Sequence, residues 1–162
     1  MRAAFCLMLA LVAGAVPAQS ADTVTQRDAA AVFAKAEQMI RSTLQLKTSL
    51  PPFAASDAGL TRDQVIGRFA QIVSLVTPKF VFNSPRLATF PSLMTFKDAH
   101  VRLQADNLAA SGFVDRVGPL LTSKEPGMTA SEFGDALGYF LCRVAEMTHT
   151  PSSKYSPYLM PG

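Results

Sequence analysis

Two stretches decide the fold: Asp57-Ala-Gly-Leu-Thr-Arg-Asp-Gln-Val65 and Glu125-Pro-Gly-Met-Thr-Ala-Ser-Glu-Phe133. Each contains, in order, an acidic residue, a glycine, an aliphatic residue, a threonine, a Gln or Glu three positions later, and an apolar residue. This order is typical of a capping box, in which the Thr side chain accepts from the third helical amide and the Gln or Glu accepts from the Thr amide. Both stretches therefore predict the start of a helix.

The residues expected to form this structural motif are Gly59, Thr61, Gln64, Gly127, Thr129 and Glu132. The glycines are expected to permit a tight approach to the helix, in the left-handed region if needed. The two threonines are 68 positions apart (129 minus 61), and the same offset pairs apolar positions inside the helices, such as Phe69 with Leu137. Two interpretations remain open, two ordinary helix starts or a duplicated unit, and the matched apolar positions favour duplication.

Apolar residues recur at helical spacing in four segments. The expected helices run from Thr25 to about Leu46, from Thr61 to Thr77, from Thr95 and Asp98 toward Ser111, and from Thr129 to Thr150. Gly112 is expected to end the third helix as a C-terminal cap residue. The sequence thus predicts an all-α protein, with helix–loop–helix units at 25–78 and 93–149 packed into a small bundle. A proline-rich tail follows at 150–162.

The first 18 residues resemble a cleavable signal peptide. Arg2 supplies a positive charge, residues 3–16 are uncharged and mostly apolar, and Val16-Pro17-Ala18 suits a signal peptidase. Cleavage is expected before Gln19, with Asp22 as the second choice. The alternative is an uncleaved anchor, but the apolar run is shorter than the roughly 20 residues of a membrane span. We therefore expect no membrane span after cleavage and an exported protein that is periplasmic, envelope-associated or extracellular.

Composition limits the classes of function. The chain is 49% hydrophobic and 17% charged, with a net charge of +3, which indicates a domain with a real core. The basic residues form no cluster, whereas a nucleic-acid reader shows a concentrated basic stripe. We therefore expect no nucleic-acid partner.

The sequence points to no catalytic, metal or cofactor site. It contains no G-x-S-x-G, H-E-x-x-H or haem-attachment motif and no phosphate-binding glycine loop. Cys142, Glu146 and His149 share a helix face and could in principle bind a metal, but the favoured interpretation packs Cys142 as a small buried hydrophobe. An intermolecular disulfide at Cys142 and a hydrolase with paired carboxylates are the alternatives. We expect a non-enzyme without cofactor or metal.

The second unit resembles the S-layer homology domain. The similar residues are Phe90-Pro-Ser-Leu93, His100-Val101, Leu108-Ala-Ala-Ser-Gly112-Phe-Val114, Thr129-Ala-Ser-Glu-Phe133 and Arg143, while the first unit keeps Thr61-Arg-Asp-Gln-Val65. Members of that family usually carry three units, which assemble into a three-pronged bundle that grips cell-wall polysaccharide, and only two units are visible here. Ser92 stands where the family has Asp, Ala130 stands where it has the motif arginine, and the chain has no Trp.

The resemblance implies a non-catalytic cell-envelope module whose partner is a cell-wall glycan or an envelope protein. Arg62 matches the ligand-contacting arginine of the family, so the resemblance makes it the candidate ligand-binding residue. The other interpretation of Arg62 is a solvated residue in the first turn of a helix. The other interpretation of the chain is a free-standing secreted helical protein with a structural or protein-binding role.

Overall fold

A computed structural model describes residues 23–81 and 96–155. Its elements are α1 (Gln26–Leu44), α2 (Arg62–Val76), η1 (Thr77–Lys79), α3 (Ala99–Ala110), α4 (Pro119–Thr122), α5 (Ala130–Met147) and η2 (Ser152–Tyr155). The described chain holds isolated β-bridges but no strand of a sheet. The predicted all-α fold is thus confirmed. The expected signal peptide, the motif residues Phe90–Leu93 and Thr95, and the last seven residues lie outside the described ranges.

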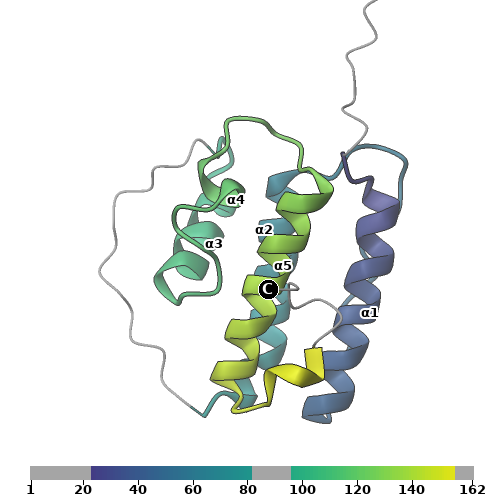
Figure 1. The fold of residues 1–162 in the computed structure, drawn as a ribbon, viewed down its shortest axis with the longest axis vertical. Helices are drawn as coiled ribbons and strands as arrows, with labels where there is room; N and C mark the ends of the chain where they lie inside the picture. The colour runs from purple at the N-terminus through teal and green to yellow at the C-terminus, as the bar shows by residue number, and fades with distance from the viewer. Residues whose placement is uncertain (1–22, 82–95, 156–162) are drawn as a thin grey trace, which may run out of the picture.

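The long helices α1, α2 and α5 lie side by side and begin at the same end of the molecule (Figure 1). Because α1 and α2 start together, residues 45–60 must run back along the whole of α1. A helix of 19 residues is about 28 Å long, and 16 extended residues span up to about 50 Å. The loop, which contains Pro51 and Pro52 and forms no helix over residues 46–60, is long enough for this return.

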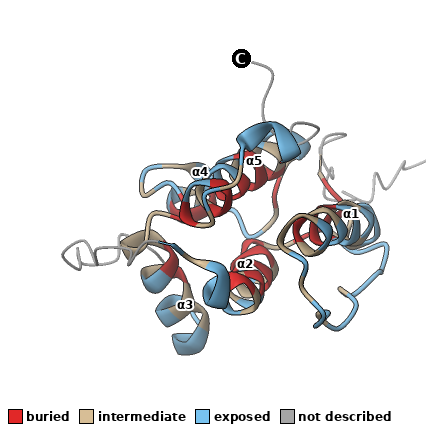
Figure 2. Cartoon of the chain, turned by 90° about the horizontal axis from the view of Figure 1, so that it is seen from below, coloured by how far each residue is buried: buried red, intermediate tan, exposed pale blue. Residues whose placement is uncertain are grey.

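The core lies between these three helices, whose buried faces point toward one another (Figure 2). Four phenylalanines connect them. Phe33 of α1 lies 6.2 Å from Phe69 of α2 and 5.3 Å from Phe133 of α5, measured between ring centroids. Phe69 also stacks on Phe140 of α5 at 4.1 Å. Since all four rings are at most 5% exposed, they supply much of the apolar burial that holds the bundle together.

A buried ion pair fastens α1 to α2. The Arg68 guanidinium binds both carboxylate oxygens of Glu37, with an Nη2–Oε2 distance of 2.8 Å. Its Nη1 donates to the Pro51 carbonyl at 2.8 Å and to the Gln71 side chain at 2.9 Å. The two charged side chains are only 5% and 10% exposed. Their hydrogen bonds within the protein therefore stand in for most of the bonds to water that burial removes.

Gly112 ends α3 as the sequence predicts. It has φ of 74°, its amide donates to the Ala109 carbonyl, and the Phe113 amide donates to Leu108. These two bonds form a Schellman motif, which favours glycine at the left-handed position.

Gly59 and Gly127 do not use the left-handed region that glycine permits, since neither is among the described residues with positive φ. They lie in extended bridges, because backbone pairing and not a turn brings the chain to the helix. One sequence interpretation is wrong. Cys142 is exposed, not packed in the core, because the apolar stripe of α5 passes through its neighbour Leu141.

Candidate functional site

The three long helices start from one backbone junction. Met128 donates its amide to the Leu60 carbonyl at 3.1 Å, Leu60 donates to Val24 at 2.7 Å, and Val24 donates to Met128 at 3.1 Å. Each of these residues directly precedes the threonine that caps a helix. The hydrogen bonds therefore close a ring, in which every segment donates to one neighbour and accepts from the other.

The three segments are copies of one motif. They read Val24-Thr-Gln-Arg-Asp28, Leu60-Thr-Arg-Asp-Gln64 and Met128-Thr-Ala-Ser-Glu132. The antiparallel bridges repeat as well, because each pairs a capping threonine with the residue two positions before the next one: Thr25 with Gly59, Thr61 with Gly127, and Thr129 with Thr23. The motif thus occurs three times, with approximate threefold symmetry at the junction.

The sequence predicts the second and third copies as a pair, but it does not identify the first copy as a member of the set. Thr25 was expected to cap α1, and it does, since its Oγ1 accepts from the Asp28 amide at 3.1 Å. However, Asp28 stands where the other copies have Gln or Glu, and Thr23 stands where they have glycine. Asp28 is a methylene shorter than Glu, and its carboxylate accepts from the Thr25 hydroxyl at 2.8 Å instead of reaching the Thr25 amide.

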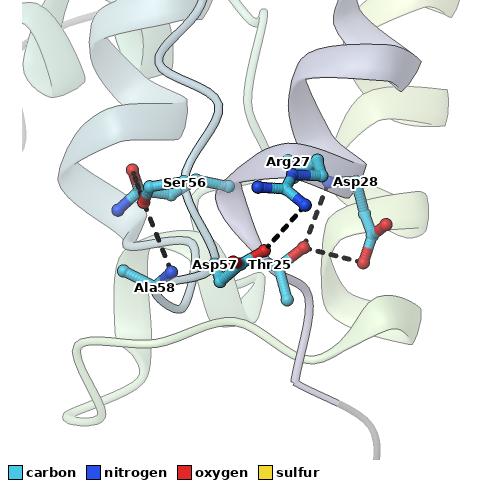
Figure 3. A network of polar contacts seen from close by, with 7 residues as sticks. Thr25, Arg27, Asp28, Ser56, Asp57 and Ala58 are labelled. Atoms are coloured by element: carbon cyan, nitrogen blue, oxygen red, sulfur yellow. Dashed lines mark hydrogen bonds and ion pairs between the residues drawn. The ribbon is translucent and has the colours of Figure 1, made fainter.

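Polar contacts secure this first copy to the returning loop (Figure 3). The Arg27 guanidinium lies 3.2 Å from the Asp57 carboxylate, with both side chains mostly exposed. The Ser56 hydroxyl donates to Gln26 at 2.9 Å and accepts from the Ala58 amide. Exposed pairs contribute little to stability, so these contacts join the loop to the start of α1 without adding much to the free energy of folding.

Both predicted capping boxes are present. At α2 the Gln64 amide donates to Thr61 Oγ1 at 3.3 Å, and the Thr61 amide donates to Gln64 Oε1 at 3.0 Å. At α5 the Glu132 amide donates to Thr129 Oγ1 at 3.2 Å, and the Thr129 amide donates to Glu132 Oε2 at 2.9 Å. Each box satisfies two amides that a helix start otherwise leaves without partners. These residues build the junction and leave Arg62 as the candidate ligand contact.

Arg62 is the first residue of α2, and its backbone amide donates to the Pro126 carbonyl at 3.0 Å. This bond and the Thr61–Gly127 bridge hold the start of α2 against the segment that leads into α5. The Arg62 residue is only 8% exposed, and its guanidinium carbon lies 5.7 Å from the centre of the Phe96 ring. The interpretation of Arg62 as a solvated residue is therefore wrong. Phe96 lies 34 positions after Arg62 in the sequence, so no local sequence pattern could predict the contact between them.

The Arg62 guanidinium lacks a hydrogen-bond acceptor on its buried Nε, and the described chain gives it no salt bridge. Burial lowers the pKa of Arg62, and the negative charges of Asp63, Glu132 and Glu125 oppose that shift. A buried donor without an acceptor is costly, whereas an acceptor placed against the Nε of Arg62 would form a strong charge-assisted bond. The arrangement can thus bind an isolated anionic group, and the surrounding carboxylates disfavour a dense polyanion.

The remaining sequence candidates are explained by structural contacts. Arg143 donates from Nε to the Ser111 carbonyl at 3.1 Å and from Nη1 to Glu146 at 2.7 Å, so it fastens the end of α3 to α5. His149 has φ of 53° and ends α5. Within residues 23–81 and 96–155, no group of three or more His, Cys, Asp or Glu could hold a metal ion.

The geometry defines the class of protein as a small helical domain organised around a threefold capping junction. Comparison of the chain with protein-family models, with curated proteins and with solved structures finds no match. No helix in the described part of the chain has both the length and the apolar character needed to cross a membrane.

Proposed function

We propose that this chain is a non-catalytic module of the cell envelope that binds cell-wall polysaccharide, with Arg62 as the ligand contact. One observation carries the proposal: three copies of a helix-opening motif meet at one junction, and the middle copy places there a buried arginine whose Nε has no hydrogen-bond acceptor. The S-layer homology domains that the sequence resembles usually have three units and a ligand-contacting arginine at this motif position. The first copy, Val24–Asp28, supports the proposal because it brings the number of motif copies from two to the three that such domains usually have.

The chemistry of Arg62 fits an acidic sugar. Its guanidinium presents a rigid fork of donors, which matches a carboxylate in a bidentate manner. The folded protein already bears the cost of burying this cation, so an anionic ligand would recover part of that cost when it binds. The nearby carboxylates of Asp63, Glu125 and Glu132 favour a polymer with spaced negative charges over one with adjacent charges.

The test is co-sedimentation with purified cell-wall sacculi, with thermal unfolding measured on the same samples. The test variant is Arg62→Met, which removes the charge but keeps an apolar stem beside Phe96. The control is Arg27→Met, which removes an exposed arginine from the first copy of the motif. We expect wild type and the Arg27 variant to sediment, and the Arg62 variant to stay in solution with an unchanged or higher melting temperature.

Two results would contradict the proposal. Wild-type protein that stays in the supernatant would refute wall binding and favour the alternative of a secreted structural or protein-binding role. Equal sedimentation of Arg62→Met and wild type would refute the role of Arg62. Arg62→Lys separates charge from geometry, since a lysine retains the cation but loses the bidentate fork; we expect it to bind more weakly than wild type.

A further inference from the structure

A concave feature lies between residues 114–120 and the first turns of α5. It is a pocket of about 180 Å³, far larger than the ~10–15 Å³ that one water molecule requires. Its apolar lining comes from Val114, Pro119, Leu120 and Ala136. The short helix α4 thus forms one wall, and α5 forms the other. The pocket has room for the apolar stem of a side chain.

Three carboxylates also line this pocket: Asp115, Glu132 and Asp135. One oxygen of Glu132 accepts from the Thr129 amide at 2.9 Å, and one oxygen of Asp115 accepts from the Val117 amide at 3.1 Å. The salt bridges of the described chain involve other acidic residues, namely Asp57, Glu37 and Glu146. Glu132 is also one of the carboxylates whose charge acts on Arg62, so the negative charge of the pocket that has no salt bridge within the described ranges comes from Asp115 and Asp135.

Exposed apolar surface borders the same pocket. Tyr139 lines it and is 46% exposed, and Val117, in the turn between the lining residues Asp115 and Gly118, is 78% exposed. These are two of the four large hydrophobic residues exposed in the described ranges. An aromatic ring beside carboxylates attracts a cation through its face. An apolar rim around such a point is typical of a protein-binding site.

We propose that this pocket docks an arginine side chain of a partner protein. A guanidinium stacks on an aromatic ring and donates to carboxylates through its planar fork, and it is less strongly hydrated than an ammonium group. The methylene stem would lie along Leu120 and Ala136, while Val117 would contact the partner around the anchor. Arg62 does not line the pocket, and although Glu132 acts on both sites, the variants that test the pocket change Asp135 and Tyr139, so this proposal and the wall-binding proposal can fail separately.

The test uses nuclear magnetic resonance of the ¹⁵N-labelled protein with a defined probe, acetyl-Gly-Arg-Gly-amide. We expect saturable shifts of the amide signals of residues 115–118 and 132–139, weaker at high salt. The matched neutral probe contains citrulline in place of arginine and should shift these signals far less. Asp135→Asn should weaken binding of the arginine probe about fivefold, the upper range for an exposed ion pair. The control Asp106→Asn, the same change on α3, should leave binding unchanged.

The outcomes are decisive. Shifts confined to residues outside the pocket, or no shifts, would overturn the proposal. Equal shifts with the citrulline probe would show that charge plays no part, which also overturns it. Glucosamine is titrated as a second cation, and tighter binding of glucosamine than of the arginine probe would assign the pocket to an amino sugar instead of a protein. If Asp135→Asn perturbs folding, Tyr139→Leu serves as the second variant, and retained affinity in that folded variant would refute the cation–aromatic contact.

Discussion

Glu37→Gln should be among the most destabilising conservative changes in the described chain. The substitution removes the negative charge opposite Arg68 and turns one acceptor oxygen into a donor that faces another donor. The two bonds of Arg68 to Glu37 are lost or weakened, whereas its bonds to Pro51 and Gln71 remain. Breaking one side of a buried pair typically costs 3–5 kcal/mol. Because Arg68 keeps two acceptors, we expect a loss of about 3 kcal/mol, at the lower end of that range.

Equilibrium unfolding in urea measures this loss, provided that the slope of the transition is unchanged. The matched control is Glu146→Gln, which breaks the partly exposed pair with Arg143 and should cost less than about 1 kcal/mol. The double variant Glu37→Met with Arg68→Met should recover most of the stability, since apolar replacement of a buried pair is often neutral or favourable. Equal losses from the Glu37 and Glu146 variants would refute the reasoning.

Four further substitutions test single residues. Thr129→Ala should lower the free energy of unfolding by about 1 kcal/mol through loss of the capping box, and an unchanged urea midpoint and slope would contradict this. Gly112→Ala should lower the free energy of unfolding by about 1–3 kcal/mol, because φ is 74° and the added carbon would lie 3.3 Å from Arg143 Nε. Gly134→Ala, in open space within α5, should instead raise the free energy of unfolding by up to about 1 kcal/mol. Burial raises the pKa of Tyr155, so its contribution to stability is complete below pH ~10 and is lost as the pH rises further. Tyr155→Phe should therefore resist alkaline unfolding better than wild type above that pH. If the free energies of unfolding of the two proteins fell equally with pH, Tyr155 would not be the group responsible.

The helices could be predicted because their signals are local. Thr61 and Thr129 were expected to begin helices, and α2 and α5 begin at the next residue in each case. The apolar spacing that predicts a helix also predicts its buried face, as Phe69 and Phe140 show. In such segments the capping chemistry and the hydrophobic period favour the same structure.

The features that sequence reasoning missed depend on residues far apart in the chain. Glu37 and Arg68 are 31 positions apart on two different helices, and each alone resembles an ordinary polar helix residue. The burial of Arg62 depends on Phe96 from before α3. The two predicted helix–loop–helix units, α1 with α2 and α3 with α5, stay a prediction. The symmetry of the junction is a different one, because it relates the starts of α1, α2 and α5.

The closed ring at the junction has a consequence for the timing of folding. Val24 leaves the ribosome early, but its amide needs the carbonyl of Met128, which follows 104 residues later (128 minus 24). At ~5–20 residues per second, the wait is about 5–20 seconds. During that time the Val24 carbonyl can accept from Leu60, but the Val24 amide has no acceptor in the ring. Phe33 of α1 and Phe69 of α2 also lack their aromatic partners on α5. The domain should therefore become protease-resistant in a single late step, when α5 arrives, and not helix by helix.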